Sequence, residues 1–367
     1  MHVTALHAAG FRNLAHGPIG FDPGITLLWG PNGAGKSNVL EALCLALGGH
    51  SPRTRREREA IAFGEDVARC EVEVAEEGGT TRYLWSLSRF GERRRQAGGH
   101  PIGERERVRP PLAYFHPDRL DLVKGPPATR RGYLDRASDL RWPARAAVRR
   151  AYAQALAQRN ALLARVRAGA AHEEALDTWD RRLAEAGVEL IECRSQTLAA
   201  LSGPFAQAAI ELGLPEPVEV AYRPRTEATE PEGLEAELRE RRSTDTERGY
   251  TAHGPHLDDV AIAAAGRPLR RYGSQGQQRL AVVALLLAER SLAAERPAPV
   301  ALMLLDDLMS ELDPDRRESL ASRLAAGGGQ AIVTATEPDH LPASCPRLEV
   351  ELGAPDERVA PAARIAA

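Results

Sequence analysis

The sequence predicts an α/β fold in which a mainly helical lobe is inserted into a mixed sheet. An apolar strand at residues 25–29 runs into a glycine-rich turn and then an apolar helix, which is the start of a β-α unit. Polar and apolar side chains alternate over residues 67–90, with a break at 77–79, as in an antiparallel hairpin. Residues 129–212 shift to Ala, Arg, Leu and Glu, and their apolar stripe at 176–190 has helical spacing. We interpret this stripe as core packing, since it is too short for an extended coiled coil.

Length and composition allow one large domain or two joined lobes. The chain has 367 residues, of which 43% are hydrophobic, enough for a core or two. We expect lobe I, which holds the sheet, over residues 1–125 and 250–355, and the helical lobe II over 126–249. An exposed linker is expected near 215–249 because proline, glutamate and arginine are frequent there, with one short helix around Leu234–Arg242. A flexible tail is expected over 356–367.

Composition argues against a membrane protein and against a disulfide scaffold. No segment approaches the roughly 20 apolar residues of a membrane span, and the N-terminus does not resemble a signal peptide. The four cysteines show no paired spacing. We therefore expect a soluble, cytoplasmic protein. Because the formal net charge is −3, any surface that binds nucleic acid must be local.

The turn after the first apolar strand carries a phosphate-binding motif. Residues 30–37 fit the pattern GxxxxGK[ST] between a strand and a helix, where backbone N–H groups curve around a phosphate. We expect Lys36 to reach the β- and γ-phosphate oxygens and Ser37 to ligate Mg²⁺, so ATP and Mg²⁺ are the predicted cofactors. A glycine turn without a ligand is the alternative. The predicted ATP contacts are Gly30, Pro31, Asn32, Gly33, Ala34, Gly35, Lys36, Ser37 and Asn38.

A second apolar strand, residues 300–305, ends at two adjacent aspartates. Ligands gather at the carboxyl ends of strands in α/β sheets. We expect Asp306 to hold Mg²⁺ through water, and Asp307 to orient or deprotonate an attacking water. Asp307 and Lys36 are thus the predicted catalytic residues. Capping of the following helix is the alternative explanation for the aspartates.

Residues 272–279, which read Tyr-Gly-Ser-Gln-Gly-Gln-Gln-Arg, precede another apolar helix. Taken alone, Ser274 is only an N-cap candidate. In this position between the glycine-rich motif and the two aspartates, the segment resembles the signature loop of the ATP-binding-cassette (ABC) family. The resemblance implies an ABC-type ATPase head in which Ser274, Gln275, Gly276 and Gln277 bind ATP held by a second subunit. It also implies a D-loop that includes Ser310 and Asp313 at the same interface.

Further segments, taken together and in order, resemble the RecF family of bacterial recombination mediators. These segments are residues 6–14, 50–54, 63–66, 115–123, 130–135 and 253–259. The resemblance implies a two-lobed head related to those of SMC proteins, without their long coiled coil, that forms a homodimer on ATP and binds DNA. It further implies a role in gap repair, in which the protein helps to load the RecA recombinase together with RecO and RecR.

Departures from the transporter pattern predict slow hydrolysis. The strand at 331–336 is not followed by the histidine of transporter cassettes, and Thr334 or Thr336 could contact the γ-phosphate instead. Asp307 replaces the usual glutamate, which shortens its reach to water. We therefore expect a weak ATPase whose hydrolysis acts as a dimerisation switch. No glutamine is assigned to the Q-loop, because Gln96 is expected in an exposed hairpin loop.

Arginine clusters are the candidate DNA contacts. Arg53, Arg130 and Arg131 are preferred because their segments resemble those of the family. Other candidates are Arg55, Arg56, Arg58, residues 93–95, Arg105, Arg107, Arg109, Arg145, Arg149 and Arg150. A solvated charged face is the alternative for each cluster. Since aromatic residues do not interleave with these arginines, we expect recognition of the backbone of duplex or gapped DNA.

Two other functions are weighed against this one. An ABC transporter motor subunit would need a membrane-coupling surface and usually carries the switch histidine. An SMC-type chromosome-organising head would show long heptads between the glycine-rich motif and the signature loop, where this chain has a compact lobe.

Overall fold

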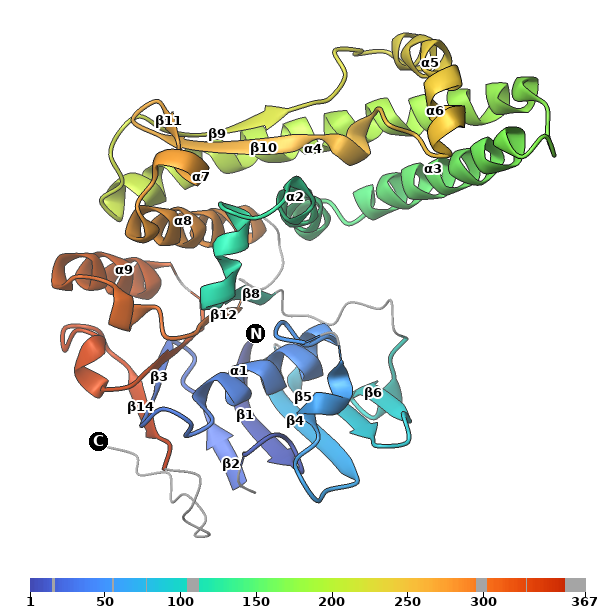
Figure 1. The fold of residues 1–367 in the computed structure, drawn as a ribbon. Helices are drawn as coiled ribbons and strands as arrows, with labels where there is room; N and C mark the ends of the chain where they lie inside the picture. The colour runs from blue at the N-terminus through green and yellow to red at the C-terminus, as the bar shows by residue number, and fades with distance from the viewer. Residues whose placement is uncertain are drawn as a thin grey trace. The chain divides into compact units, whose positions relative to one another are not determined.

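The computed structural model describes residues 1–14, 17–54, 56–76, 78–103, 112–294, 302–327 and 329–353. The predicted tail over 356–367 and the candidate residues Arg55, Arg105, Arg107 and Arg109 lie outside the described residues. The chain forms two compact units (Figure 1). The first comprises the described residues of 1–119 and 293–367, and the second comprises Leu120–Leu292. Residues 250–292, which were expected in lobe I, therefore belong to the second, mainly helical unit.

The first unit holds an antiparallel sheet and a parallel sheet. The antiparallel sheet has the order β2-β1-β4-β5-β6-β7 and the parallel sheet the order β14-β3-β13-β12-β8. The antiparallel strands are β1 (His2–Ala9), β2 (Gly17–Gly20), β4 (Val67–Glu76), β5 (Gly79–Ser88), β6 (Arg93–Ala97) and β7 (His100–Pro101). The parallel strands are β3 (Ile25–Trp29), β8 (Leu112–Phe115), β12 (Leu302–Leu305), β13 (Ala331–Ala335) and β14 (Leu348–Glu351). Strands β4 and β5 confirm the antiparallel hairpin predicted over residues 67–90. Gln96, which was expected in a hairpin loop, lies within β6.

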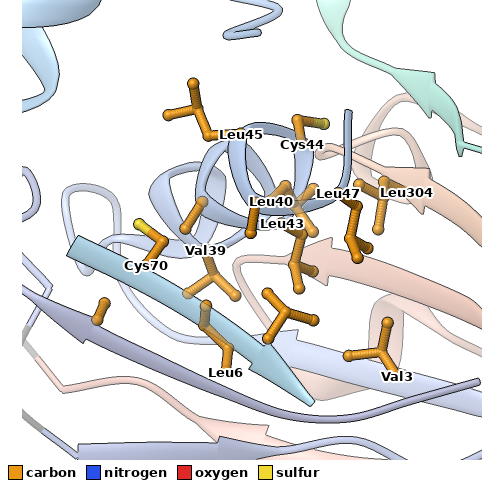
Figure 2. Close-up of a cluster of buried hydrophobic side chains, with 14 of the residues drawn as sticks. Val3, Leu6, Val39, Leu40, Leu43, Cys44, Leu45, Leu47, Cys70 and Leu304 are labelled. Atoms are coloured by element: carbon orange, nitrogen blue, oxygen red, sulfur yellow. The ribbon is translucent and has the colours of Figure 1, made fainter. Parts of the chain in front are cut away.

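Helix α1 (Lys36–Leu43), which continues as a π-helical turn at Cys44–Gly48, packs against both sheets. Its buried side chains Val39, Leu40 and Leu43 join a cluster with Leu6 and Cys70 from the antiparallel sheet (Figure 2). Full burial of such a side chain contributes about 1.5–3 kcal/mol. This packing fixes the start of α1 relative to the strands. The other helices of the unit are α9 (Pro314–Ala326) and short 3₁₀ turns at Glu57–Ala60, Met309–Glu311 and Pro338–His340.

The second unit is mainly helical and carries a small antiparallel sheet of order β11-β10-β9. Its strands are β9 (Val218–Arg223), β10 (Asp259–Ala264) and β11 (Arg267–Pro268). Its helices are α2 (Pro127–Arg141), α3 (Arg145–Arg167), α4 (Leu176–Glu211), α5 (Pro231–Glu240), α6 (Arg242–Arg248), α7 (Leu269–Tyr272) and α8 (Gln275–Ala294), with 3₁₀ turns at Glu173–Ala175 and Pro255–Leu257. The 3₁₀ turn Pro117–Leu122 spans the boundary between the units.

The core of the second unit supports the interpretation of the apolar stripe and corrects the expected linker. Leu183 and Leu190 of α4 pack in one buried cluster with Leu234 and Leu238 of α5. The segment 215–249 is therefore not a simple exposed linker, because it contributes β9, α5 and α6. Helix α5 lies where a short helix was expected around Leu234–Arg242, but its leucines are buried. Within the described part of the chain, no helix has the length and apolar character required to cross a membrane.

Candidate nucleotide site

The glycine-rich turn connects β3 to α1 and is shaped by backbone contacts. Gly30 and Gly33 have φ angles of 148° and 87°, which residues with a side chain rarely adopt. A Cβ atom at Gly30 would lie 2.3 Å from the carbonyl oxygen of Leu352, so only glycine fits there. Apart from Gly33 and its two neighbours in the chain, no atom of the described residues lies within 4 Å of a Cβ built at Gly33, so the outer part of the turn is open. We call residues 30–37 the phosphate loop.

Lys36 is buried at the end of the phosphate loop, and its ammonium group is held by carbonyl oxygens. Its Nζ atom donates to the oxygens of Gly30, at 2.7 Å, and Pro31, at 3.0 Å. Burial lowers the pKa of Lys36, and the charges of Asp307 and Asp306 raise it, with a net lowering. A buried ammonium group with carbonyl partners and partial desolvation has much to gain from an anion, whose negative charge would offset the cost of burial.

Asp306 lies at the carboxyl end of β12 and accepts hydrogen bonds from hydroxyl groups of neighbouring elements. Ser37 and Thr334 donate to its Oδ1 atom at 2.8 and 2.9 Å, and Tyr114 donates to Oδ2 at 3.3 Å. Strands β8 and β13 flank β12, so Tyr114 and Thr334 reach Asp306 from opposite sides. Burial and the charge of Asp306 raise the pKa of Tyr114, which keeps its phenol protonated as a donor. The carboxylate is thereby tied to the first turn of α1.

Asp307 combines a strained backbone with an unsatisfied carboxylate oxygen. Its φ angle is 48°, a region that non-glycine residues occupy at a cost of about 1–3 kcal/mol. The Thr334 hydroxyl accepts from its backbone N–H at 2.9 Å, and Ser310 donates to its carbonyl oxygen at 2.9 Å. Its buried Oδ1 atom has no hydrogen-bond partner among the described residues. Strain and an orphaned acceptor at one residue are typical of a functional position.

Thr334 therefore does something other than expected. It was one of two threonines predicted to contact a γ-phosphate. The structure shows its side chain fully buried, with the hydroxyl donating to Asp306 and accepting from Asp307. One hydroxyl thus aligns both members of the acid pair, by which we mean Asp306 and Asp307. Thr336, half-buried beyond the end of β13, is the remaining candidate for the γ-phosphate.

Comparison with known proteins identifies the family to which this fold and site belong. A protein from Heliobacterium modesticaldum called DNA replication and repair protein RecF is 38% identical over 361 residues, which cover 94% of each chain. This chain belongs to the RecF family. Residues 5–109 also match a family model described as AAA domain. A solved structure of the recombination mediator protein RecF with ATP, in the RecFOR pathway, aligns with a TM-score of 0.82 and 26% identity over 95% of each chain.

The fold is that of an ABC-type ATPase head, as predicted. An Smc head domain from Pyrococcus furiosus with an extended coiled coil has a TM-score of 0.60 at 18% identity, covering 96% of this chain and 94% of that one. This likeness concerns the fold alone. Together with the RecF structure, it confirms the expected combination of a mixed sheet unit and an inserted helical lobe.

The segment that resembles the signature loop belongs to the second unit and opens α8. Ser274 and Gln277 form reciprocal bonds: the Gln277 N–H donates to Ser274 Oγ at 3.2 Å, and the Ser274 N–H to Gln277 Oε1 at 2.9 Å. This capping box fixes the N-terminus of a 20-residue helix. Gln278 donates to the carbonyl oxygens of Leu269 and Gly273, which holds the preceding turn. Ser274 and Gln275 are exposed, so the helix N-terminus faces solvent within this unit.

The predicted D-loop residues have clear local partners. Ser310 is bonded to the carbonyl oxygen of Asp307, as described above. Asp313 is the N-cap of α9, where its Oδ1 accepts from the Arg316 N–H at 3.0 Å. Ser310 thus supports the acid pair, and Asp313 is an exposed cap.

The three preferred DNA-contact residues are all engaged inside this RecF-family chain. Arg53 donates to Asn38 Oδ1 at 2.6 Å, beside the phosphate loop, and remains 40% exposed. Arg130 is buried and makes a bidentate bond to Asp259 at 2.6 and 3.0 Å, so its guanidinium has a structural partner where a DNA contact was expected. Arg131 donates to the carbonyl oxygen of Asp258 at 2.6 Å.

Several residues of the site were not assigned from the sequence. Asn13 donates to the Gly33 carbonyl oxygen at 2.6 Å and accepts from Asn38 at 2.6 Å, which ties the phosphate loop to α1. Glu41 is fully buried and accepts from Arg12, Ser51 and Arg53. Residues 6–14 and 50–54 resembled the family, but the resemblance gave no role to individual side chains. For Tyr114, which donates to Asp306, the sequence offered one signal: a polar residue near the end of a buried strand.

Proposed function

We propose that this protein is an ATP-dependent DNA-binding protein of recombinational gap repair that works as a head-to-head dimer with slow hydrolysis. The observation that carries the proposal is the acid pair at the carboxyl edge of the parallel sheet, hydrogen-bonded through Ser37 to the phosphate loop. A carboxylate next to the serine of this motif is the arrangement of P-loop ATPases. Family membership supplies the biological setting, because the relative from Heliobacterium modesticaldum is a DNA replication and repair protein.

The first step of the proposed mechanism is capture of the ATP phosphates by the phosphate loop. The open turn at Gly33 leaves room for the β-phosphate against backbone N–H groups. Lys36 would exchange its carbonyl partners, Gly30 and Pro31, for β- and γ-phosphate oxygens. The solved structure of a RecF protein with ATP supports this assignment.

The second part concerns Mg²⁺ and the attacking water. The Ser37 hydroxyl and the Asp306 carboxylate, 2.8 Å apart, offer the hard oxygen ligands that Mg²⁺ prefers, so the residues fit the ion. When bound, the ion would neutralise charge that develops between the β- and γ-phosphates. Asp307 presents a carboxylate oxygen without a partner, which suits a base that orients and deprotonates water. Its side chain is shorter than glutamate, in keeping with slow hydrolysis.

The third part is dimerisation. The exposed N-terminus of α8, fixed by the Ser274–Gln277 capping box, offers free N–H groups and a positive helix end to a γ-phosphate. In the proposed dimer, Ser274 to Gln277 of one copy bind the ATP that is held by the phosphate loop of the other. Ser310 and Asp313 would lie along the same interface. Hydrolysis then removes the γ-phosphate that joins the two copies.

The proposed partners are DNA, a second copy of this chain, the mediators RecR and RecO, and the RecA recombinase. The RecFOR pathway named for the solved RecF structure supports RecR and RecO as partners. In this proposal, dimerisation on ATP raises the affinity for gapped DNA, where the protein helps to load RecA.

Binding to a labelled gapped duplex, measured by fluorescence anisotropy with ATP and Mg²⁺, with ADP, and without nucleotide, tests the proposal. We expect tight binding only with ATP and Mg²⁺, and loss of that effect in Lys36→Ala. Lys124→Ala, which removes the other lysine of the chain at an exposed position, is a matched control that should retain the effect. Equal affinity in all three nucleotide states would contradict the proposed ATP-dependent DNA binding.

A further inference from the structure

A recess of about 510 Å³ on the second unit has a strongly basic lining. It lies where the segment after β9 meets α6 and the chain that follows α6. The lining includes Arg225, Arg241, Thr244, Asp245, Arg248 and His253. None of these residues was assigned to a site by the motifs in the sequence.

Two buried or partly buried acidic groups near this recess, Asp245 and Glu237, are bonded to groups other than its exposed arginines. Asp245 is buried, and its carboxylate accepts from the fully buried Arg159 at 2.7 Å. Glu237, which lies behind His253, accepts from Thr226 and from His253 itself. The charge of Glu237 still acts on Arg241, but neither carboxylate is paired with Arg225 or Arg248.

The arginines themselves are largely free. Within the described part of the chain, the side chains of Arg225 and Arg248 make no ion pair or hydrogen bond, and both residues are exposed. Arg241 has one ion pair, with Glu240 at 3.5 Å, but both side chains are solvent-accessible, so the pair is weak. Arg167 donates to the carbonyl oxygen of Arg248 at 3.2 Å and adds a fourth guanidinium nearby.

A second recess, on the first unit, shows that such basic excess is not general. Its volume is about 430 Å³, and its lining includes Arg69, Glu71, Glu73 and Arg82. Here each arginine is paired with a glutamate: Arg69 with Glu71 at 2.7 Å and Arg82 with Glu73 at 3.0 Å. The first-unit recess is therefore neutral within itself, whereas the second-unit recess is open to an external anion.

We propose that the second-unit recess binds the phosphodiester backbone of DNA, an inference that rests on the proposed DNA-binding function. Guanidinium groups match phosphate oxygens in geometry and remain charged at any physiological pH. The exposed Thr244 hydroxyl adds a neutral donor. The lining contains no Phe, Tyr or Trp side chain, and its one aromatic ring, that of His253, is buried and bonded to Glu237, which favours contact with the backbone independent of sequence. It also lacks the apolar centre that a protein partner would bury.

The test replaces the free arginines without adding negative charge. The double variant Arg225→Gln with Arg248→Gln removes two positive charges from the recess. The double variant Arg69→Gln with Arg82→Gln is the matched control, because it makes the same change in net charge at the neutral recess. Affinity for a gapped duplex is measured for each with ATP and Mg²⁺ over a series of salt concentrations, and dimerisation is checked by sedimentation velocity.

We expect the recess variant to bind DNA about 10-fold more weakly at physiological salt. The slope of log affinity against log salt should fall by about 0.9 for each lost phosphate contact. Its ATP-dependent dimerisation and the DNA affinity of the control should stay unchanged. Unaltered affinity and slope in the recess variant, while the wild-type chain binds DNA, would overturn the inference alone. If the wild-type chain binds no DNA with ATP, the proposed function fails and the inference fails with it. If the recess variant loses binding to polyglutamate but keeps its affinity for DNA, the recess binds an acidic protein segment, and the inference is also overturned.

Discussion

One residue from each unit shows two opposite ways in which a buried charge is held. In the second unit, Arg159 is fully buried, but its guanidinium is bonded to Asp180, Asp245 and Thr251. In the first unit, the Asp307 carboxylate has a buried oxygen that no described residue contacts by a hydrogen bond, and its backbone is strained. A buried charge with complete pairing specifies a fold, whereas an unpaired one at a sheet edge is held ready for a ligand. The comparison teaches that pairing, and not charge or burial alone, separates structural residues from candidate functional ones.

The largest effect is expected from Asp307→Asn. Removal of a general base typically lowers the rate 10²- to 10⁴-fold, so we predict a drop of that size in single-turnover ATP hydrolysis. Because the native oxygen has no partner, the free energy of unfolding should not fall. The ATP-bound dimer should accumulate. Asp315→Asn, at an exposed position in α9, is the control. Wild-type turnover in Asp307→Asn would move the catalytic role to another residue.

The opposite pattern is expected for Arg159→Ala in the second unit. This change leaves Asp180 and Asp245 buried without their cation, which should lower the free energy of unfolding by about 3–5 kcal/mol. Urea denaturation followed by circular dichroism measures the effect. Arg165→Ala on the same helix should change stability by less than about 0.5 kcal/mol, because Arg165 is exposed and, among the described residues, its side chain makes only a 3.5 Å bond to the carbonyl oxygen of Ala170. Similar stability of the two variants would contradict the structural role of Arg159.

Thr334→Val tests a residue that contributes both to the stability of the fold and to the position of Asp306 and Asp307. Loss of the hydroxyl leaves the backbone N–H of Asp307 without its acceptor, which should cost about 1–3 kcal/mol in thermal unfolding. Hydrolysis should fall because Asp306 and Asp307 lose their shared support, while the KM for ATP changes less than kcat. Thr334→Ser keeps the hydroxyl and should restore the rate. A serine variant as slow as the valine variant would show that packing, not the hydrogen bonds, is responsible.

Among the variants expected to lose stability, the smallest loss is expected at the capping box. Ser274→Ala removes the acceptor of the Gln277 N–H and should destabilise the second unit by about 1 kcal/mol. Ser274→Asn preserves an N-cap acceptor and should differ little from the wild type. Differential scanning calorimetry of the two variants distinguishes these outcomes. Equal stability in all three proteins would mean that the cap contributes nothing measurable to α8.

Features that depend on adjacent residues were predictable from the sequence. The phosphate loop is one continuous motif, and the acid pair directly follows a buried strand, so each could be located from a short segment. The β4-β5 hairpin and the apolar spacing of α4 were also legible, because both reflect local periodicity.

Features that depend on partners far away in the chain could not be predicted from the sequence. Arg130 was expected to face DNA, but its partner Asp259 lies 129 residues further along the chain. Thr334 meets Asp306 only because β13 is the neighbour of β12, and strand order cannot be read from either segment. The short helix expected around Leu234–Arg242 is present as α5, but its burial was not predicted: Leu234 and Leu238 pack against α4 despite the polar composition around them.

Sedimentation velocity with and without ATP and Mg²⁺ tests the central claim most directly, because the proposed mechanism requires two copies to share each nucleotide. We predict a monomer without ATP, a dimer with ATP and Mg²⁺, and loss of that dimer in Ser274→Arg. Ser243→Arg, at an exposed position of α6, adds the same charge and should still dimerise. A monomer in all conditions, or a dimer that persists in Ser274→Arg, would contradict the head-to-head account.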